Sequence, residues 1–125
     1  MNPDMLSKLE ALKAQPKFVD EPGTIYNGMR PEQERRIAEA LVDRLIETFI
    51  LEYSKLNTRR WVSQQFTQAL KRFNGHDTED RERMCTYVQQ IAEILEIETP
   101  RRLLTFWLYG RVLGTLLLLQ RPKAG

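Results

Sequence analysis

The sequence predicts an all-α protein, a single compact bundle of about five helices with a buried, apolar C-terminal helix. Apolar residues recur at three- and four-residue spacing over most of the chain, and each periodic stretch begins at a capping residue or a proline. The run from Leu103 to Leu119 is apolar on nearly every side, as in a helix covered all around. No linker or internal repeat divides the 125 residues, so residues 1–125 are expected to form one helical domain.

The composition is typical of a globular domain that folds by packing alone. Hydrophobic residues make up 42% of the chain and charged residues 29%. The lone cysteine, Cys85, cannot form an internal disulfide, and no secretory signal is visible after Met1, so we expect a cytoplasmic protein that starts here. The 19 basic residues are nearly matched by 17 acidic ones dispersed among them, and this small net charge of +2 argues against nucleic-acid binding.

A short helix and a long loop are expected first. Asp4 suits the cap of this helix and Pro16 prevents its continuation. Its apolar stripe comprises Met5, Leu6, Leu9 and Leu12. Residues 15–30 contain two prolines and two glycines, which predict an irregular connection. The expected anchors of this loop are Phe18, Ile25 and Tyr26.

Three amphipathic helices are expected to follow. Their starts are predicted at Pro31 as the first helical residue, at Asn57 or Thr58 as a cap, and at Asp77 or Thr78 as a cap. Gly75 is expected to end the second of them in the left-handed conformation. The apolar rows are Ile37, Leu41, Leu45 and Phe49 beside Val42, Ile46 and Ile50; then Val62, Phe66, Leu70 and Phe73; then Met84, Val88, Ile91 and Leu95.

The last helix is expected to start at Thr99-Pro100 and to be the hydrophobic axis of the bundle. Arg111, near the middle of its apolar run, would cost roughly 2.5 to 3.5 kcal/mol inside a bilayer, which favours a buried core helix over a membrane span. Gly110 and Gly114 are spaced so that a neighbouring helix can approach closely.

No catalytic or cofactor-binding signature is present in the sequence. The single histidine, His76, is poorly placed to activate Cys85, which we predict to be a small core hydrophobe. One polar cluster is dense, and its members are His76, Asp77, Glu79, Asp80 and Glu82. Helix capping accounts for Asp77 and Asp80, and Glu79 can pair with Arg83 one turn later; a metal site over His76–Asp80 stays open as the alternative.

Several segments resemble a family of small, uncharacterised helical proteins of bacteria. The most distinctive are residues 77–82, Cys85, Tyr87, residues 94–98 and residues 107–110; Lys17-Phe18 and the turn at residues 26–28 are similar in kind. The resemblance implies a compact helical bundle from Gram-negative bacteria with no established catalytic residues. Proteins of this kind are often immunity partners of secreted toxins. The leucine-rich stretch 111–120 departs from the family pattern.

We therefore expect a non-enzymatic protein-binding module, most concretely an immunity protein that binds and neutralises a cognate bacterial toxin. A basic toxin cleft would meet acidic side chains. The candidate partner-binding residues are Asp20, Glu21, Asp77, Glu79 and Asp80. The alternative is a small metal-dependent or regulatory protein with its site at His76–Asp80. We expect no cofactor and no nucleic-acid or membrane partner; a homodimer through the C-terminal helix is compatible with either function.

Overall fold

The structure, a computed structural model, describes residues 1–75 and 77–120, with side chains up to Gly110 except His76. It contains five α-helices, namely α1 (Pro3–Ala14), α2 (Glu32–Leu51), α3 (Arg59–Arg72), α4 (Thr78–Ile94) and α5 (Arg101–Gln120), and a 3₁₀ turn, η1 (Tyr53–Lys55). No strand occurs in the described ranges, which confirms the predicted all-α class.

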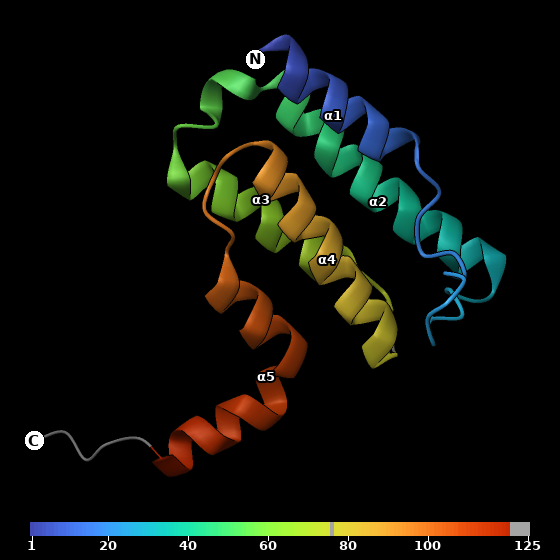
Figure 1. Cartoon of the computed structure of the whole chain (residues 1–125). Helices are drawn as coiled ribbons and strands as arrows, with labels where there is room; N and C mark the ends of the chain where they lie inside the picture. The colour runs from blue at the N-terminus through green and yellow to red at the C-terminus, as the bar shows by residue number, and fades with distance from the viewer. Residues whose placement is uncertain (76, 121–125) are drawn as a thin grey trace, which may run out of the picture.

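The first four helices form a compact bundle in which successive helices run in opposite directions (Figure 1). Helix α2 packs against both α1 and α3, α1 also contacts α4, and α5 packs against α4. The loop 15–30 connects α1 to α2 and lies at the end of the bundle where α2 and α4 begin (Figure 1). This loop therefore lies beside the start of α4, about 50 residues later in the sequence.

The structure corrects three details of the helix ends. Asn2, not Asp4, caps α1: its side-chain oxygen accepts a hydrogen bond from the Met5 backbone N–H at 2.7 Å, because Pro3 already occupies the first helical position. Pro31 holds the cap position of α2 rather than the first helical residue. At the end of α3, Gly75 does not adopt the left-handed conformation; a Cβ there would lie 2.4 Å from the Phe73 ring, so close packing requires glycine.

The core is formed by the facing stripes of α1 to α4. The fully buried apolar side chains include Leu9, Val42, Ile46, Phe49, Phe66, Leu70, Met84, Val88 and Ile91. The predicted rows of α3 and α4 are buried in full, which confirms them. On α2 the row starts one turn late, because Ile37 is 51% exposed while Ala38 is buried in its place. Each helix thus contributes one stripe, as expected for an amphipathic bundle.

The C-terminal helix is not the axis of the bundle over the residues whose side chains are described. Between residues 101 and 110 only Leu104 is buried, while Phe106 is 63% and Tyr109 44% exposed. The expectation of a buried helix is wrong for residues 101–110, because α1 to α4 already cover one another's stripes and this part of α5 packs on the outside. Among the described residues, a Cβ on Gly110 would come within 4 Å of Phe106 of its own helix only, at 3.9 Å, and the predicted close approach of a second helix is not seen there. The side chains of Arg111, Gly114 and the following leucines lie outside the described residues.

Trp107 attaches α5 to the bundle. Its indole N–H donates a hydrogen bond to the Leu70 carbonyl at 3.1 Å, and its ring packs edge-on against Phe73 at 5.6 Å between centroids. The Arg81 guanidinium lies over the same ring at 4.1 Å and donates to the Trp107 carbonyl. The helix then bends at Tyr109, where the backbone is not helical (Figure 1). Within the residues described, no helix is long and apolar enough to cross a membrane.

Candidate functional site

The acidic residues singled out in the sequence come from two segments that the fold brings together. Asp20 and Glu21 belong to the loop 15–30, while the other three, Asp77, Glu79 and Asp80, start α4. Two side-chain hydrogen bonds join the segments: the Tyr26 hydroxyl donates to Asp80 Oδ1 at 2.9 Å, and Arg83 Nη2 donates to Glu21 Oε2 at 2.5 Å. We refer to Asp20, Glu21, Asp77, Glu79 and Asp80 as the acidic surface.

The acidic surface is largely exposed to solvent. Asp20, Glu21, Asp77 and Glu79 are exposed, and only Asp80 is partly buried. Asp77 has a structural role as well, because its side chain caps α4 by accepting the Glu79 backbone N–H at 3.1 Å. Burial raises the pKa of the Asp80 carboxyl, the neighbouring Asp77 adds to this rise, and the hydrogen bond from Tyr26 opposes it.

Arg83 does not pair with Glu79, as the four-residue spacing predicts, but with the loop. Its guanidinium reaches Glu21 and also lies 4.6 Å from the centroid of the Tyr26 ring. Tyr26 is only 5% exposed, and burial together with its bond to Asp80 raises the pKa of its hydroxyl well above the ordinary value. The phenol therefore remains a hydrogen-bond donor to Asp80 throughout the neutral range.

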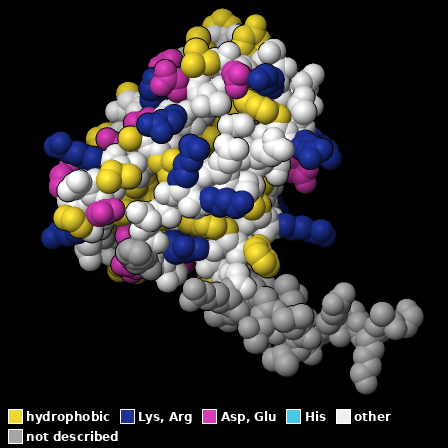
Figure 2. Space-filling model, turned by 180° about the vertical axis from the view of Figure 1, so that it is seen from behind, with side chains coloured by type: hydrophobic (Ala, Val, Ile, Leu, Met, Phe, Trp, Pro, Cys, Tyr) yellow, Lys and Arg dark blue, Asp and Glu magenta, His cyan; other side chains and the backbone are white. Residues whose placement is uncertain are grey.

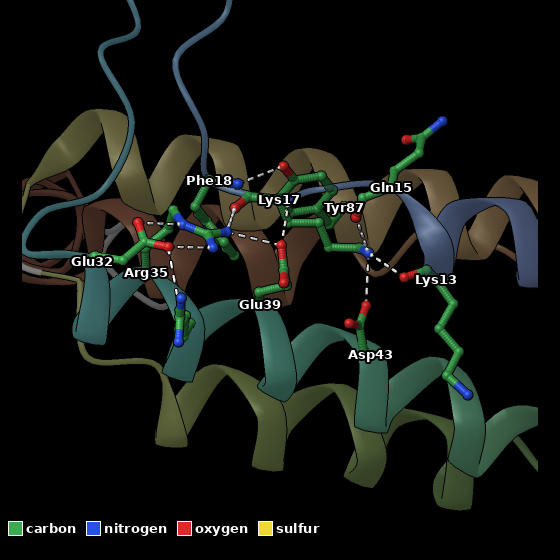
Figure 3. A network of polar contacts seen from close by, with 10 residues as sticks. Lys13, Gln15, Lys17, Phe18, Glu32, Arg35, Glu39, Asp43 and Tyr87 are labelled. Atoms are coloured by element: carbon green, nitrogen blue, oxygen red, sulfur yellow. Dashed lines mark hydrogen bonds and ion pairs between the residues drawn. The ribbon is translucent and has the colours of Figure 1, made fainter.

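Lys17, which is fully buried, attaches the start of the loop to α1 and α2 (Figure 3). Its ammonium forms an ion pair with Asp43 Oδ1 at 2.6 Å and donates hydrogen bonds to the carbonyls of Lys13 at 3.1 Å and Gln15 at 2.9 Å. Its backbone N–H donates to Glu39 Oε2 at 2.7 Å. A buried charge is stable only when it is paired and its donors are satisfied, and three partners meet that condition here.

Arg35 of α2 extends this network toward the start of its helix (Figure 3). Its Nη1 donates to the Lys17 carbonyl at 3.0 Å and to Glu39 Oε2 at 2.9 Å, while Nε and Nη2 bind both carboxylate oxygens of Glu32. This two-pronged hydrogen bond from Arg35 lowers the pKa of Glu32 to about 2. Both backbone polar groups of residue 17 are thus bound by side chains of α2.

The next residue, Phe18, turns the chain away from the core. Its ring is fully buried, its φ of 58° is left-handed, and its backbone N–H donates to the Tyr87 hydroxyl at 3.0 Å. The Met29 N–H donates to the Phe18 carbonyl at 2.8 Å, which closes the loop. Gly28, with φ 80°, faces this contact, and a Cβ on it would lie 2.8 Å from the Asp20 nitrogen.

Of the predicted loop anchors, Phe18 and Tyr26 are correct and Ile25 is wrong. Ile25 is 83% exposed, because the turn that binds the Glu21 N–H to the Tyr26 carbonyl at 3.2 Å directs Tyr26, not its neighbour, toward α4. The anchors that the sequence did not indicate are Lys17 and Tyr87. A lysine in a proline-containing loop is ordinarily solvated, so no local signal distinguishes this one.

Among the described side chains, no group of three or more His, Cys, Asp and Glu residues could hold a metal ion. His76, on which the alternative metal site depends, lies outside the described residues. Cys85 is a buried free thiol, and burial raises its pKa to about 11, so it stays protonated at neutral pH.

A cleft of about 730 Å³ borders the acidic surface between the end of the loop and the start of α4. Its lining includes Arg30, Glu34, Asn74, Asp77 and Asp80, with the loop backbone around Gly28. The lining holds one cation and three carboxylates, so the cleft continues the negative charge of the acidic surface.

Comparison with known proteins agrees with the fold. No curated protein matches the chain. A solved structure of similar fold is the crystal structure of a DUF3571 family protein from Acinetobacter baumannii AYE, which is 27% identical, with a TM-score of 0.75 over 90% of this chain and 94% of that one. The family model described as "Domain of unknown function (DUF4844)" matches residues 1–112. The chain therefore belongs to the DUF4844 family.

Proposed function

We propose that this protein is a non-enzymatic, cytoplasmic protein-binding domain, in its most concrete form an immunity protein that neutralises a bacterial toxin. The observation that carries the proposal is the placement of Asp20 and Glu21 beside the start of α4, where Asp77, Glu79 and Asp80 continue the same charge. An acidic surface of this kind is complementary to a basic cleft on a partner.

The way in which the loop is held supports a binding role. Lys17, Phe18 and Tyr26 are all at most 5% exposed, and each is bound by a side chain of α2 or α4. A loop that is ordered before the partner arrives loses little conformational entropy on binding. The carboxylates are thus displayed on a rigid support, which favours a specific partner over general electrostatic attraction.

The proposal predicts that a toxin is encoded beside this gene, and that toxin provides the test. Cells that express the toxin should survive when this protein is co-produced and die without it, and the two purified proteins should form a 1:1 complex. A toxin that is harmless in the absence of this protein would remove the immunity role.

Charge reversal locates the contact. The variant Asp20→Lys/Glu79→Lys changes two exposed carboxylates of the acidic surface that form no side-chain ion pair in the described structure. It should weaken toxin binding about tenfold or more and abolish protection. Glu10→Lys/Glu93→Lys is the matched control, with the same charge change at exposed positions of α1 and α4 outside the acidic surface. Equal affinity of both variants would contradict the assignment of this surface.

A further inference from the structure

A second cleft, of about 740 Å³, lies between the start of α3 and the start of α5. It is lined by one face of α3, by the connection from α4 to α5, and by the first turn of α5. None of the residues of the acidic surface takes part in it, so it is a separate site.

The floor of this cleft is apolar. Val62 and Phe66, which are 8% and 1% exposed, connect it to the core, and three partly buried side chains, Leu56, Ile97 and Leu103, form its walls. Apolar surface that stays open in a cleft marks a binding site for an apolar group.

The rim of the cleft is cationic. Arg59, Arg101 and Arg102 line it, are exposed, and form no ion pair with a carboxylate in the part of the chain that the structure describes. Arg35 and Arg83, in contrast, are held by carboxylates elsewhere in the molecule. One carboxylate, Glu98, also lines the cleft, so the three arginines leave an excess of positive charge.

The surroundings preserve this excess. All 17 acidic residues lie at positions 1–52 and 77–98, while the stretches 53–76 and 99–125 contain none and hold five basic residues each. The acidic residues are therefore not dispersed among the basic ones as the composition suggested. On the face opposite that of Figure 1, Lys and Arg side chains extend across the middle of the surface between apolar patches (Figure 2). Among the lining residues that the structure describes, Glu98 is thus the one carboxylate that can compete for the rim arginines.

We propose that this cleft binds a single-chain amphiphile with an anionic phosphate or carboxylate head and an apolar tail. The head would pair with Arg59, Arg101 and Arg102, whose guanidinium groups suit planar or tetrahedral oxyanions. The tail would lie along the partly buried walls, Leu56, Ile97 and Leu103. An inorganic anion would leave these walls in water, and a neutral apolar molecule would leave the arginines unpaired; only a ligand with both parts satisfies the lining. The cleft also has the volume usual for small-molecule sites.

Calorimetry with defined probes tests the ligand class. Dodecyl phosphate and dodecanoate, kept below their aggregation concentrations, distinguish the two heads, and 1:1 binding of either supports the proposal. Inorganic phosphate and dodecyl maltoside should each bind at least about tenfold more weakly, because each lacks one of the two parts. Equal binding of inorganic phosphate, preferential binding of a single-stranded oligonucleotide, or binding only to phosphatidylglycerol vesicles would overturn it.

Paired variants test the location. Arg59→Gln/Arg101→Gln should weaken binding about tenfold or more, whereas Arg44→Gln, at an exposed arginine of α2, should not. Ser63→Phe places a ring in the cleft and should block the tail; Gln64→Phe, the next residue on α3 and not part of the lining, is its control. Unchanged affinity in both cleft variants would overturn the assignment. None of these four variants should change toxin binding. A negative result for the cleft therefore leaves the proposal for the acidic surface intact, and the reverse also holds.

Discussion

At the scale of single residues, the fully buried Lys17 decides how the loop meets the bundle. Its ammonium binds the Lys13 and Gln15 carbonyls left free at the end of α1 and pairs with Asp43 of α2. One side chain thereby completes the C-terminal end of one helix and joins it to the next. In many helices a glycine in the left-handed conformation binds these last carbonyls. Here the chain leaves α1 in an extended conformation at Gln15, and Lys17 binds the carbonyls instead.

Removing the carboxylate partner of Lys17 should be costly. We expect Asp43→Ala to lower the free energy of unfolding by about 3 kcal/mol, because the buried ammonium keeps only two carbonyl partners. Asp43→Asn retains an oxygen acceptor and should cost less. Urea denaturation measures both, with Glu47→Ala as control, since its ion pair with Lys13 spans 3.8 Å at the surface and should contribute less than about 1 kcal/mol. A similar loss in the two alanine variants would show that the Lys17 pair is not stabilising.

At the scale of elements, the loop 15–30 behaves as part of the folded bundle rather than as a flexible connection. Side chains of α2 and α4 bind its backbone at Lys17 and Phe18, and its own backbone closes from Met29 to Phe18. The close approach of Gly28 to Asp20 is what allows the chain to fold back on itself. The position of Asp20 on the acidic surface therefore depends on the backbone of residue 28.

Two glycines of this loop offer a matched test. Gly23 and Gly28 both have positive φ, 85° and 80°, but only a Cβ on Gly28 would meet backbone atoms. Gly23→Ala should lower the free energy of unfolding by about 1 kcal/mol through conformational strain alone. Gly28→Ala should cost at least about 1 kcal/mol more, through the clash with Asp20 and Phe18, and should increase protease cleavage within the loop. Chemical denaturation and limited proteolysis measure these effects; equal losses would mean that the close approach relaxes without cost.

At the scale of the whole molecule, charge is divided between two sets of elements. The carboxylates are confined to α1, α2, α4 and their adjoining segments. In α3 and the first turn of α5, all charged side chains are Lys or Arg. The acidic surface and the arginine-lined cleft are consequently separate sites of opposite charge on one small molecule. A partner protein and a small anion need not compete for the same surface.

The pH dependence of stability is also a property of the whole fold. Burial raises the pKa of Tyr26, Tyr87 and Cys85 above their ordinary values. Groups with a raised pKa in the folded state stabilise it below their unfolded pKa, and that stability is lost as the pH rises through the folded value. The urea midpoint should therefore fall above about pH 9, where cysteine and then tyrosine ionise in the unfolded chain.

Tyr26→Phe separates the tyrosine contribution from other alkaline effects. The variant should be about 1 kcal/mol less stable at pH 7, because Asp80 loses its donor, yet its midpoint should decline less steeply above pH 10. Tyr109→Phe, at an exposed position, should keep the wild-type slope. A midpoint that is constant from pH 7 to pH 11 would contradict the expectation.

The sequence alone was sufficient for the extent and the buried stripes of α3 and α4. Periodicity and capping residues determine where α3 and α4 begin and which of their side chains are buried, because a helix of this length presents one stripe set by its own 3.6-residue repeat. The family resemblance was likewise carried by local motifs, and the match over residues 1–112 to a domain of unknown function confirms it at that level.

Only the tertiary structure decided which distant residues each helix and loop contacts. The burial of Lys17 beside Asp43 and the pairing of Arg83 with Glu21 each depend on a segment far away in the sequence, which periodicity does not report. The apolar helix that the sequence placed at the centre packs on the outside over residues 101–110, because four shorter stripes already cover one another. Hydrophobicity predicted that α5 would be covered; over residues 101–110 the packing of its neighbours instead leaves Phe106 and Tyr109 exposed.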